Sequence, residues 1–423
     1  MMPAPLPNQN SNFFQLSLLN NDILFEILAR LGAKSRGKLC CVSKSFRCII
    51  TDPSFVEFHR NWSTAASHGT TVLFSIPAPN FITKSSRHEY IPRPEDFYTV
   101  NFKSNEENQP GIGKLAKRVR HMDRVSCFGD LRYGSSAADR ICLFNGEGVV
   151  VICNLCTGQQ TPLPPSPAWS ESQAEGCALL GLDGSSDTFK VLKLEACFSD
   201  CTVKQWVLTL GLDATWREIK GSLQFYPYCS FTSGVCINSV IYFYNFVRYH
   251  LGGWSAVDCA FPIVAFDVRS ETFRRMPLPP ITYETPRWGS LLKSSFLELD
   301  GQLAILLLRN NMIFMWNLDI VANSASCWKT HTFPIPSEVE AALAVAGGKF
   351  SCTLTTTPTG EIVLLMPEAG ISSLWVLFDK FKPASRVWKK FGIKGLKDFP
   401  NLVSNSFKAI MVQNIAEAIF HLE

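Results

Sequence analysis

The pattern of apolar and polar positions changes once along this chain, near residue 68. Before that point apolar residues recur at helical spacing, so that one side of a helix carries Ile23, Leu24, Ile27, Leu28 and Leu31. After it, short apolar runs alternate with polar turns, a pattern that is typical of strands. We therefore predict an α+β protein of two domains, a small helical one followed by a larger, mainly-β one.

The helical domain is predicted at residues 17–62, after a segment at 1–16 that is rich in Asn and Pro and that we expect to be disordered. A second helix is predicted from about Ser35, and a third at Asp52-Pro53, an N-cap residue followed by proline at the first helical position. The apolar positions of these two helices are Leu39, Val42, Phe46 and Ile49, and then Phe55, Phe58 and Trp62.

Three short helices bury only a small core and leave apolar surface over. That surface can dock on the rest of the chain or on another protein, and the residues alone leave both possibilities open.

The β-rich part, residues 68–423, contains a repeat in which strand and turn sequences end in an aromatic or polar residue followed by basic or proline-rich residues. The equivalent positions are Gln160, Trp216, Phe273, Trp328 and Trp388, which are 56, 57, 55 and 60 residues apart. Repeats of this length with several strands each indicate propeller blades. We expect "TVLFSIPAPNF" (71–81) and "FKAIMVQNIAEAIFHLE" (407–423) to complete a sixth blade, because closing the ring removes exposed sheet edges.

The helical segment resembles an F-box, the motif that binds the Skp-family adaptor of Skp–cullin–F-box ubiquitin ligases. The matching residues are Asp22, Glu26-Ile27-Leu28-Ala29-Arg30-Leu31, Cys41-Val42-Ser43-Lys44-Ser45-Phe46-Arg47 and Asp52-Pro53-Ser54-Phe55.

The sequence departs from the family pattern at several positions. Asn20 and Gly32 stand where prolines are usual, and Phe46 replaces a tryptophan but keeps an aromatic ring in place. Arg36 and Gly37 stand where the family usually has leucines, and a glycine inside a helix costs about 1 kcal/mol relative to alanine.

The β-rich part resembles the F-box-associated, kelch-related β domain of many plant proteins, over residues 130–395. The matching phrases are Cys153-Asn154-Leu155-Cys156-Thr157-Gly158, Asp187-Thr188-Phe189-Lys190-Val191, Trp216-Arg217, Gly234-Val235-Cys236-Ile237-Asn238, Phe266-Asp267 and Met276-Pro277-Leu278-Pro279. This resemblance implies a kelch-like β-propeller of about six blades.

Together the two resemblances imply the substrate-recognition subunit of a Skp–cullin–F-box ubiquitin ligase. Its partners would be a Skp-type adaptor, through it a cullin and a RING subunit, and a protein substrate presented for ubiquitination and degradation. Such a subunit acts by proximity and supplies no catalytic residue. The expected adaptor contacts, several of which can instead form the core of the helical domain, are Leu19, Asn20, Ile23, Leu24, Ile27, Leu28, Leu31, Val42 and Phe46.

Composition agrees with this picture. A net charge of +4 over 423 residues argues against a nucleic-acid binder, and no apolar run reaches the length of a membrane span. The fifteen cysteines are irregularly placed and the first residues lack the features of a signal peptide, so we expect reduced thiols in the cytoplasm or nucleus. We expect no cofactor and no metal.

Three further features have competing interpretations. Cys153 and Cys156 form a CxxC that can begin a zinc site, but no second ligand pair follows at a suitable spacing, so a structural role is favoured. The basic cluster at 113–124, within a connector at about 104–126 predicted to be exposed, is either a solvated loop or a nuclear-import or phosphate-binding patch. The repeated tryptophans pack between blades or stack against sugars, and their matched positions favour packing.

Two alternatives to the ligase subunit stay open. The first is an interaction scaffold with a degenerate F-box, and the second is a propeller enzyme or sugar-binding protein. Common catalytic motifs are missing from the sequence, which speaks against the enzyme.

Overall fold

The chain divides into two units, Met1–Ser67 with Ala416–Glu423 and His68–Ile415, called unit 1 and unit 2 here and described one at a time. The computed structural model describes residues 20–31, 33–52, 54–55, 58, 69–77, 95–103, 114–115, 117–118, 132–138, 140–145, 148–154, 159–167, 175–197, 202–219, 229–231, 234–247, 263–279, 295–299, 301–319, 327–345, 353–356, 361–366, 372–378, 387–394 and 408–410.

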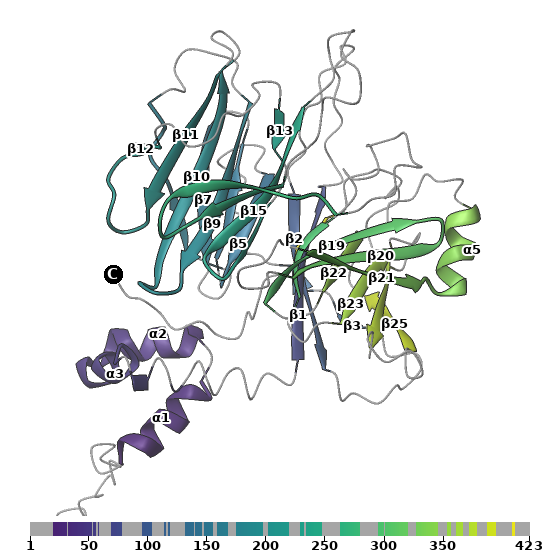
Figure 1. Cartoon of the computed structure of the whole chain (residues 1–423). Coiled ribbons are helices and arrows are strands. Elements are labelled where there is room, and N and C mark those ends of the chain that lie inside the picture. The colour runs from purple at the N-terminus through teal and green to yellow at the C-terminus, as the bar shows by residue number, and fades with distance from the viewer. Residues whose placement is uncertain are drawn as a thin grey trace, which may run out of the picture. The chain divides into compact units, whose positions relative to one another are not determined.

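Unit 1 contains the helices α1 (Asn21–Ala29), α2 (Ala33–Val42) and α3 (Lys44–Ile50), purple in Figure 1. The helix predicted from Ser35 is thus two helices. Ser43 leaves the helical conformation (φ −144°, ψ 124°), and its hydroxyl accepts a hydrogen bond from the Phe46 N–H at 3.4 Å. This N-cap starts α3 in a new direction.

The core of unit 1 is apolar and draws on every described helix. Its buried members are Leu28, Ala29, Cys40, Ile50 and Phe55. Phe25 packs its ring edge-on against Phe55, with 5.1 Å between centroids, and lies 6.1 Å from the ring of Phe58. Phe55 and Phe58 have helical backbone, as predicted for the segment after Asp52-Pro53.

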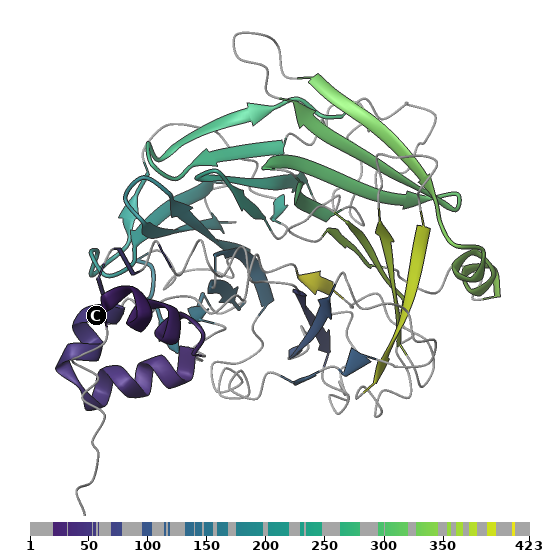
Figure 2. The same ribbon diagram turned by 90° about the horizontal axis from the view of Figure 1, so that it is seen from below.

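In unit 2 the described strands form six sheets, which Figure 2 shows following one another around a common centre. Sheet 1 contains β5 (Arg132–Ala137), β6 (Arg140–Phe144), β7 (Val150–Asn154) and β8 (Gln160–Pro162), and sheet 2 contains β9 (Glu175–Asp183), β10 (Thr188–Cys197), β11 (Thr202–Thr209) and β12 (Arg217–Glu218). Sheet 3 contains β13 (Cys229–Phe231), β14 (Val235–Ile237), β15 (Val240–Val247), β16 (Ile263–Asp267) and β17 (Thr272–Met276), and sheet 4 contains β18 (Ser295–Leu299), β19 (Gln302–Arg309), β20 (Met312–Asp319) and β21 (Cys327–Pro334). Sheet 5 contains β22 (Thr353–Thr356), β23 (Ile362–Met366), β24 (Ser372–Phe378), β25 (Val387–Lys394) and β3 (Lys114–Leu115), and sheet 6 contains β26 (Lys408–Ile410), β1 (Gly69–Pro77), β2 (Glu95–Lys103) and β4 (Lys117–Arg118).

The ring closes in the way that the sequence predicts. In sheet 6, β26 comes from the end of unit 2 and pairs with β1 from its beginning, with Leu73 opposite Ile410. The remaining strands of that sheet precede sheet 1 in the chain. The last described strand therefore completes the sheet that the first ones begin, and the propeller of six blades is confirmed.

The inner strands of sheets 1 to 3 are joined by hydrogen bonds to backbone groups. A β-bulge between Tyr133 and Ser135 turns the Ser135 hydroxyl toward β9, where it donates to the Leu180 carbonyl (3.1 Å) and accepts from the Leu180 N–H (2.5 Å). Gly134, within the bulge, accepts a hydrogen bond on its carbonyl from the N–H of Gly234 at 2.9 Å. A single hydroxyl thus satisfies both backbone groups of Leu180, which lies on the free edge of β9.

The spaces between neighbouring sheets are filled by apolar side chains. One buried cluster runs through sheets 1 to 3, a second joins sheets 3 and 4, and a third joins sheets 4 and 5. The repeated tryptophans belong here: Trp216 is buried, and Trp328 and Trp388 pack half-buried against these clusters. Packing between blades explains them without a sugar ligand.

Two local features depart from a simple repeat of strands. A helix, α5 (Ser337–Val345), lies between β21 and β22 (Figure 1). The sequence pattern had predicted only strands and turns in this part of the chain. Within the predicted basic connector, β3 pairs with β25 in parallel and β4 pairs with β2, so the backbone at these residues belongs to sheets 5 and 6. None of the described helices is long and apolar enough to cross a membrane.

Candidate functional site

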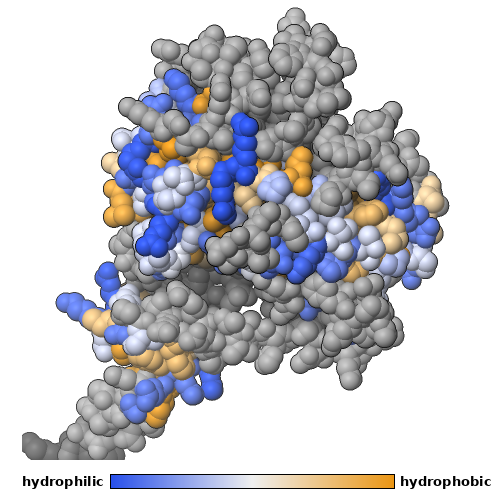
Figure 3. Space-filling view, viewed as in Figure 1, coloured by the Kyte–Doolittle hydropathy of each residue, from blue (hydrophilic) through white to orange (hydrophobic). Residues whose placement is uncertain are grey.

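The described surface of unit 1 carries three large apolar side chains in water. Ile23 is 49% exposed, Ile27 45% and Val42 77%. Ile23 and Ile27 are four residues apart on α1, so they share one face of that helix. Apolar surface can be seen beside polar surface on unit 1 in Figure 3. Exposed aliphatic residues gathered on a helix face are typical of a protein-docking surface.

The other predicted contact residues belong mainly to the core. Leu24 and Leu28 are buried, while Leu31 and Phe46 are half-buried and pack against the buried core of unit 1. Leu19 lies outside the described residues. The structure thus divides the predicted set into an exposed group of Ile23, Ile27 and Val42 and a group that packs the helices together.

Asn20, which replaces a proline of the family pattern, is the N-cap of α1. Its side-chain oxygen accepts a hydrogen bond from the Asp22 N–H at 3.5 Å, and its own carbonyl accepts from the N–H groups of Ile23 and Leu24 at 3.0 and 3.1 Å. These contacts satisfy N–H groups that the first turn of a helix leaves without partners. Asn20 therefore fixes the start of the helix that carries Ile23 and Ile27.

Arg36, which replaces a leucine, secures the other end of α1. Its side chain is fully buried, and the guanidinium donates to the carbonyl oxygens of Leu31 and, at 3.5 Å, of Ala29. A cation beside the last carbonyls of a helix is favoured by the helix dipole. The arginine at this position is thus accommodated in the interior of unit 1.

Asp52 begins the next helical segment. Its carboxylate accepts a hydrogen bond from the Ser54 N–H at 2.8 Å and another from the Ser54 hydroxyl. These bonds to Ser54 lower the pKa of the Asp52 carboxyl, because they stabilise its charged form. The Asp-Pro signal in the sequence therefore marks a helix start, as predicted.

Cys153 of the predicted CxxC is a buried residue of the propeller. Among the residues that the structure describes, no three His, Cys, Asp or Glu side chains are placed to hold a metal ion. Cys153 lies in β7, fully buried, and its burial raises the pKa of the thiol to about 12. Such a thiol is inert at neutral pH, which agrees with the structural role predicted for it. Cys156 lies outside the described residues.

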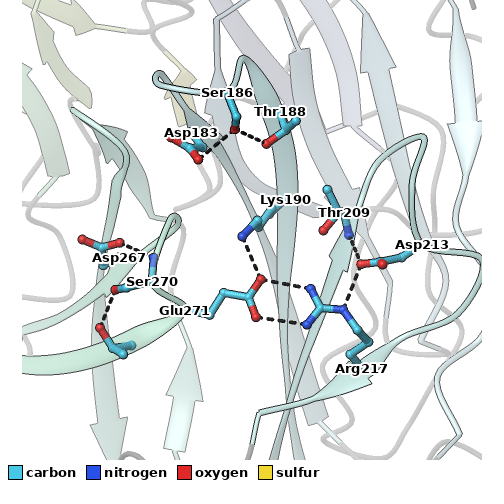
Figure 4. Close-up of polar contacts among 11 residues, drawn as sticks. Asp183, Ser186, Thr188, Lys190, Thr209, Asp213, Arg217, Asp267, Ser270 and Glu271 are labelled. Carbon is cyan, nitrogen blue, oxygen red and sulfur yellow. Dashed lines mark hydrogen bonds and ion pairs between the residues drawn. The ribbon is translucent and has the colours of Figure 1, made fainter.

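A polar cluster at the turns of sheets 2 and 3 is a link within the fold (Figure 4). The Glu271 carboxylate accepts hydrogen bonds from Lys190 at 2.7 Å and from two nitrogens of Arg217 at 3.0 and 3.1 Å, and Arg217 also contacts Asp213. Lys190 and Arg217 belong to sheet 2, and Glu271 to the turn before β17 of sheet 3. The charges are matched within the cluster, so its evident role is to fasten the two sheets together.

The comparisons with known proteins agree with the two units. Residues 94–415 match the F-box associated beta propeller domain, and residues 16–58 match the F-box domain. The first match covers more than half of the chain, so the chain belongs to the family of proteins with an F-box-associated β-propeller.

Its relatives include F-box proteins of Arabidopsis thaliana. F-box protein At1g30790 is 29% identical over 335 residues, which are 75% of this chain and 75% of that protein. Putative F-box protein At1g46984 is 27% identical over 427 residues, with 94% and 96% coverage. A solved fungal lectin from Aleuria aurantia, a six-bladed β-propeller, is similar at 10% identity and a TM-score of 0.37, over 76% of this chain and 94% of that one. The propeller assignment of this chain rests on its own strand pairing and family match.

Proposed function

We propose that this protein is the substrate-recognition subunit of a Skp–cullin–F-box ubiquitin ligase. The F-box of unit 1 would bind a Skp-type adaptor, and through it a cullin and a RING subunit, while the propeller of unit 2 would hold a target protein. The subunit would raise the local concentration of the target near the charged conjugating enzyme and take no chemical part in the transfer.

The observation that carries this proposal is the exposure of Ile23, Ile27 and Val42 on an F-box whose other described leucine, isoleucine and phenylalanine side chains are buried or half-buried. Full burial of one such side chain against a partner is worth about 1.5–3 kcal/mol. Three exposed aliphatic side chains on a small module would therefore contribute usefully to adaptor binding, although buried area does not convert directly into affinity.

The alternative, a scaffold with a degenerate F-box, rests on Asn20 and Gly37. Asn20 caps α1, and Gly37 lies within α2, which is helical from Ala33 to Val42. That the helices form around both residues supports the ligase subunit, and adaptor binding separates the two proposals.

The test is purification of the full-length protein from plant cells with the proteasome inhibited. We expect a Skp-type adaptor, a cullin and a RING protein to co-purify in comparable amounts, together with ubiquitin conjugates. A variant carrying Ile23→Asp, Ile27→Asp and Val42→Asp should lose all three subunits together. A wild-type protein that brings down no adaptor would contradict the proposal.

A further inference from the structure

The outer edge of sheet 4 is an open strand. Within the part of the chain that the structure describes, β21 pairs with β20 along its whole length and with no other strand. The register is regular from Met312 opposite Pro334 to Asp319 opposite Cys327. The backbone on one side of β21 thus pairs with β20, and the backbone on the other side faces outward from the blade.

The hydrogen bonds at one end of the ladder show which backbone groups face outward. The Ile335 N–H donates to the Asn311 carbonyl at 3.1 Å, so residue 335 points its N–H toward β20. Along an antiparallel pair, alternate residues point their N–H and C=O groups inward and outward. The groups of Trp328, Thr330 and Thr332 therefore face the open edge. Pro334 also belongs to the outward-facing set, so its missing N–H removes no hydrogen bond to β20.

The corresponding outer strands of other blades are shorter or covered. β8 has three residues, β12 two and β17 five, and β17 exposes Arg274 and Arg275. The outer strand of the next blade, β25, has eight residues like β21, but β3 is added to it in parallel, with Lys114 opposite Ile393. The chain itself thus shows that the outer edge of a blade accepts an additional strand.

The edge of β21 has little of the usual protection. Proteins discourage edge-to-edge pairing with short edges, lysines and prolines. The charged residue of β21 is Lys329, which Asp319 of β20 holds at 2.7 Å. Thr330 and Thr332 are exposed, and threonine is well suited to a strand.

We propose that β21 binds an extended segment of the target protein by strand addition, an inference that rests on the proposed function of the propeller as the target-binding unit. The target segment would form main-chain hydrogen bonds with Trp328, Thr330 and Thr332. Its β-branched side chains would lie beside the two exposed threonines.

The test compares the full-length protein with two variants at one position. Thr330→Pro removes an outward N–H and places a ring on the edge, while the ladder with β20 stays intact. Thr330→Ala keeps the N–H and serves as the matched control. Each protein is purified from plant cells with the proteasome inhibited, and the adaptor and the other bound proteins are quantified in the same samples.

We expect Thr330→Pro to reduce capture of at least one protein by about fivefold or more, while Thr330→Ala captures it like the wild type. That protein, made recombinantly, should then slow amide exchange at Thr330 and Thr332 of the wild-type chain. If Thr330→Pro unfolds, Thr332→Pro takes its place.

Three results would overturn the proposal. One is equal capture by all three proteins, including capture of nothing by any of them, and another is unchanged exchange at β21 when the captured protein is bound. The third is self-association of the chain through this edge, seen as a concentration-dependent dimer that Thr330→Pro abolishes. Adaptor capture should be the same in all three proteins, and its loss in the wild type would count against the proposed function instead.

Discussion

The indole N–H of Trp216 donates a hydrogen bond to the backbone carbonyl of Pro164, 2.6 Å away. Trp216 precedes the outer strand of sheet 2, and Pro164 follows the outer strand of sheet 1. The same bond recurs from Trp328 to the Pro277 carbonyl at 3.1 Å and from Trp388 to the Pro334 carbonyl at 3.0 Å. The aromatic and proline-rich ends of the repeat thus bind each other across neighbouring blades.

Replacement of Trp216 by phenylalanine tests this link. The variant keeps a ring in the buried site but leaves the Pro164 carbonyl without its donor, so we expect the free energy of unfolding to fall by about 1–2 kcal/mol. The control is Trp388→Phe, whose hydrogen bond is solvent-exposed and should cost less. Urea unfolding of the full chain followed by circular dichroism measures both, and equal losses would argue against a role for burial.

The bulge at Gly134 admits no side chain. A Cβ atom there would lie 1.9 Å from the carbonyl oxygen of Ala178, a backbone atom that cannot move without disturbing β9. We expect Gly134→Ala to lower the stability of unit 2 by more than about 3 kcal/mol or to prevent folding. At Gly184 the nearest atom would be 3.6 Å away, so Gly184→Ala should be tolerated. Soluble yield and thermal unfolding of the two variants check the difference.

The buried Arg36 should be indispensable to unit 1, although leucine is usual at this position in the family. Arg36→Met fills similar space but leaves the Ala29 and Leu31 carbonyls without their donor, so we expect a loss of about 1–3 kcal/mol. Arg47, exposed on α3, provides the control, and Arg47→Met should change stability by less than about 0.5 kcal/mol. A neutral or stabilising Arg36→Met, measured as amide exchange in α1, would show that the cap is dispensable.

Asp183 should make unit 2 sensitive to acid. Hydrogen bonds from the Ser185 hydroxyl and N–H, and from Ser186, lower the pKa of its carboxyl from 3.8 to about 2. Because the folded state holds the proton less tightly than the unfolded state, this stabilisation is complete above about pH 5 and is lost as the pH falls toward 2. The urea midpoint of wild type should therefore fall more steeply than that of Asp183→Asn over this range. Parallel slopes would refute the assignment.

Much of the propeller could be predicted from short-range signals. Asn238 and Ser239 lie in the turn between β14 and β15, and Gly301 lies between β18 and β19. These three residues adopt positive φ angles of 48°, 64° and 73°, as tight hairpin turns require. Asn-Ser and Asp-Gly are recognisable because few residues accept that conformation at low cost. The period of the repeat indicated the blades because Trp216, Phe273, Trp328 and Trp388 recur at matched positions and pack against the apolar clusters between blades.

Other features depended on context that the sequence pattern did not reveal. The helix α5 lies between strands and was not predicted, although its sequence carries a helix-start signal: Ser337 is followed three residues later by Glu340, with alanines after it. The interruption of the helix at Ser43 was not predicted, because apolar residues keep their helical spacing across Ser43 into α3. The buried position of Arg36 could not be predicted, because arginine is seldom buried and its partners are backbone carbonyls.

The sequence predicted which residues belong to the candidate docking site, but not which of them are exposed and which are buried. Helical spacing placed Ile23, Leu24, Ile27 and Leu28 on one broad stripe, and only packing separates the two exposed isoleucines from the two buried leucines. A core and a docking surface both require apolar residues, so the sequence alone does not show which residues of the stripe are buried and which are exposed.

The most direct test of the central claim is the affinity of the purified full-length protein for a Skp-type adaptor, measured for the wild type, Ile27→Asp and Leu212→Asp. Leu212 is 76% exposed in a turn of sheet 2, against 45% for Ile27, so its variant places the same charge on a more exposed aliphatic residue outside the F-box. We expect Ile27→Asp to weaken binding at least tenfold, roughly 1.4 kcal/mol, while Leu212→Asp binds like the wild type. A wild type that does not bind the adaptor, or an Ile27→Asp variant that binds it equally well, would contradict the account.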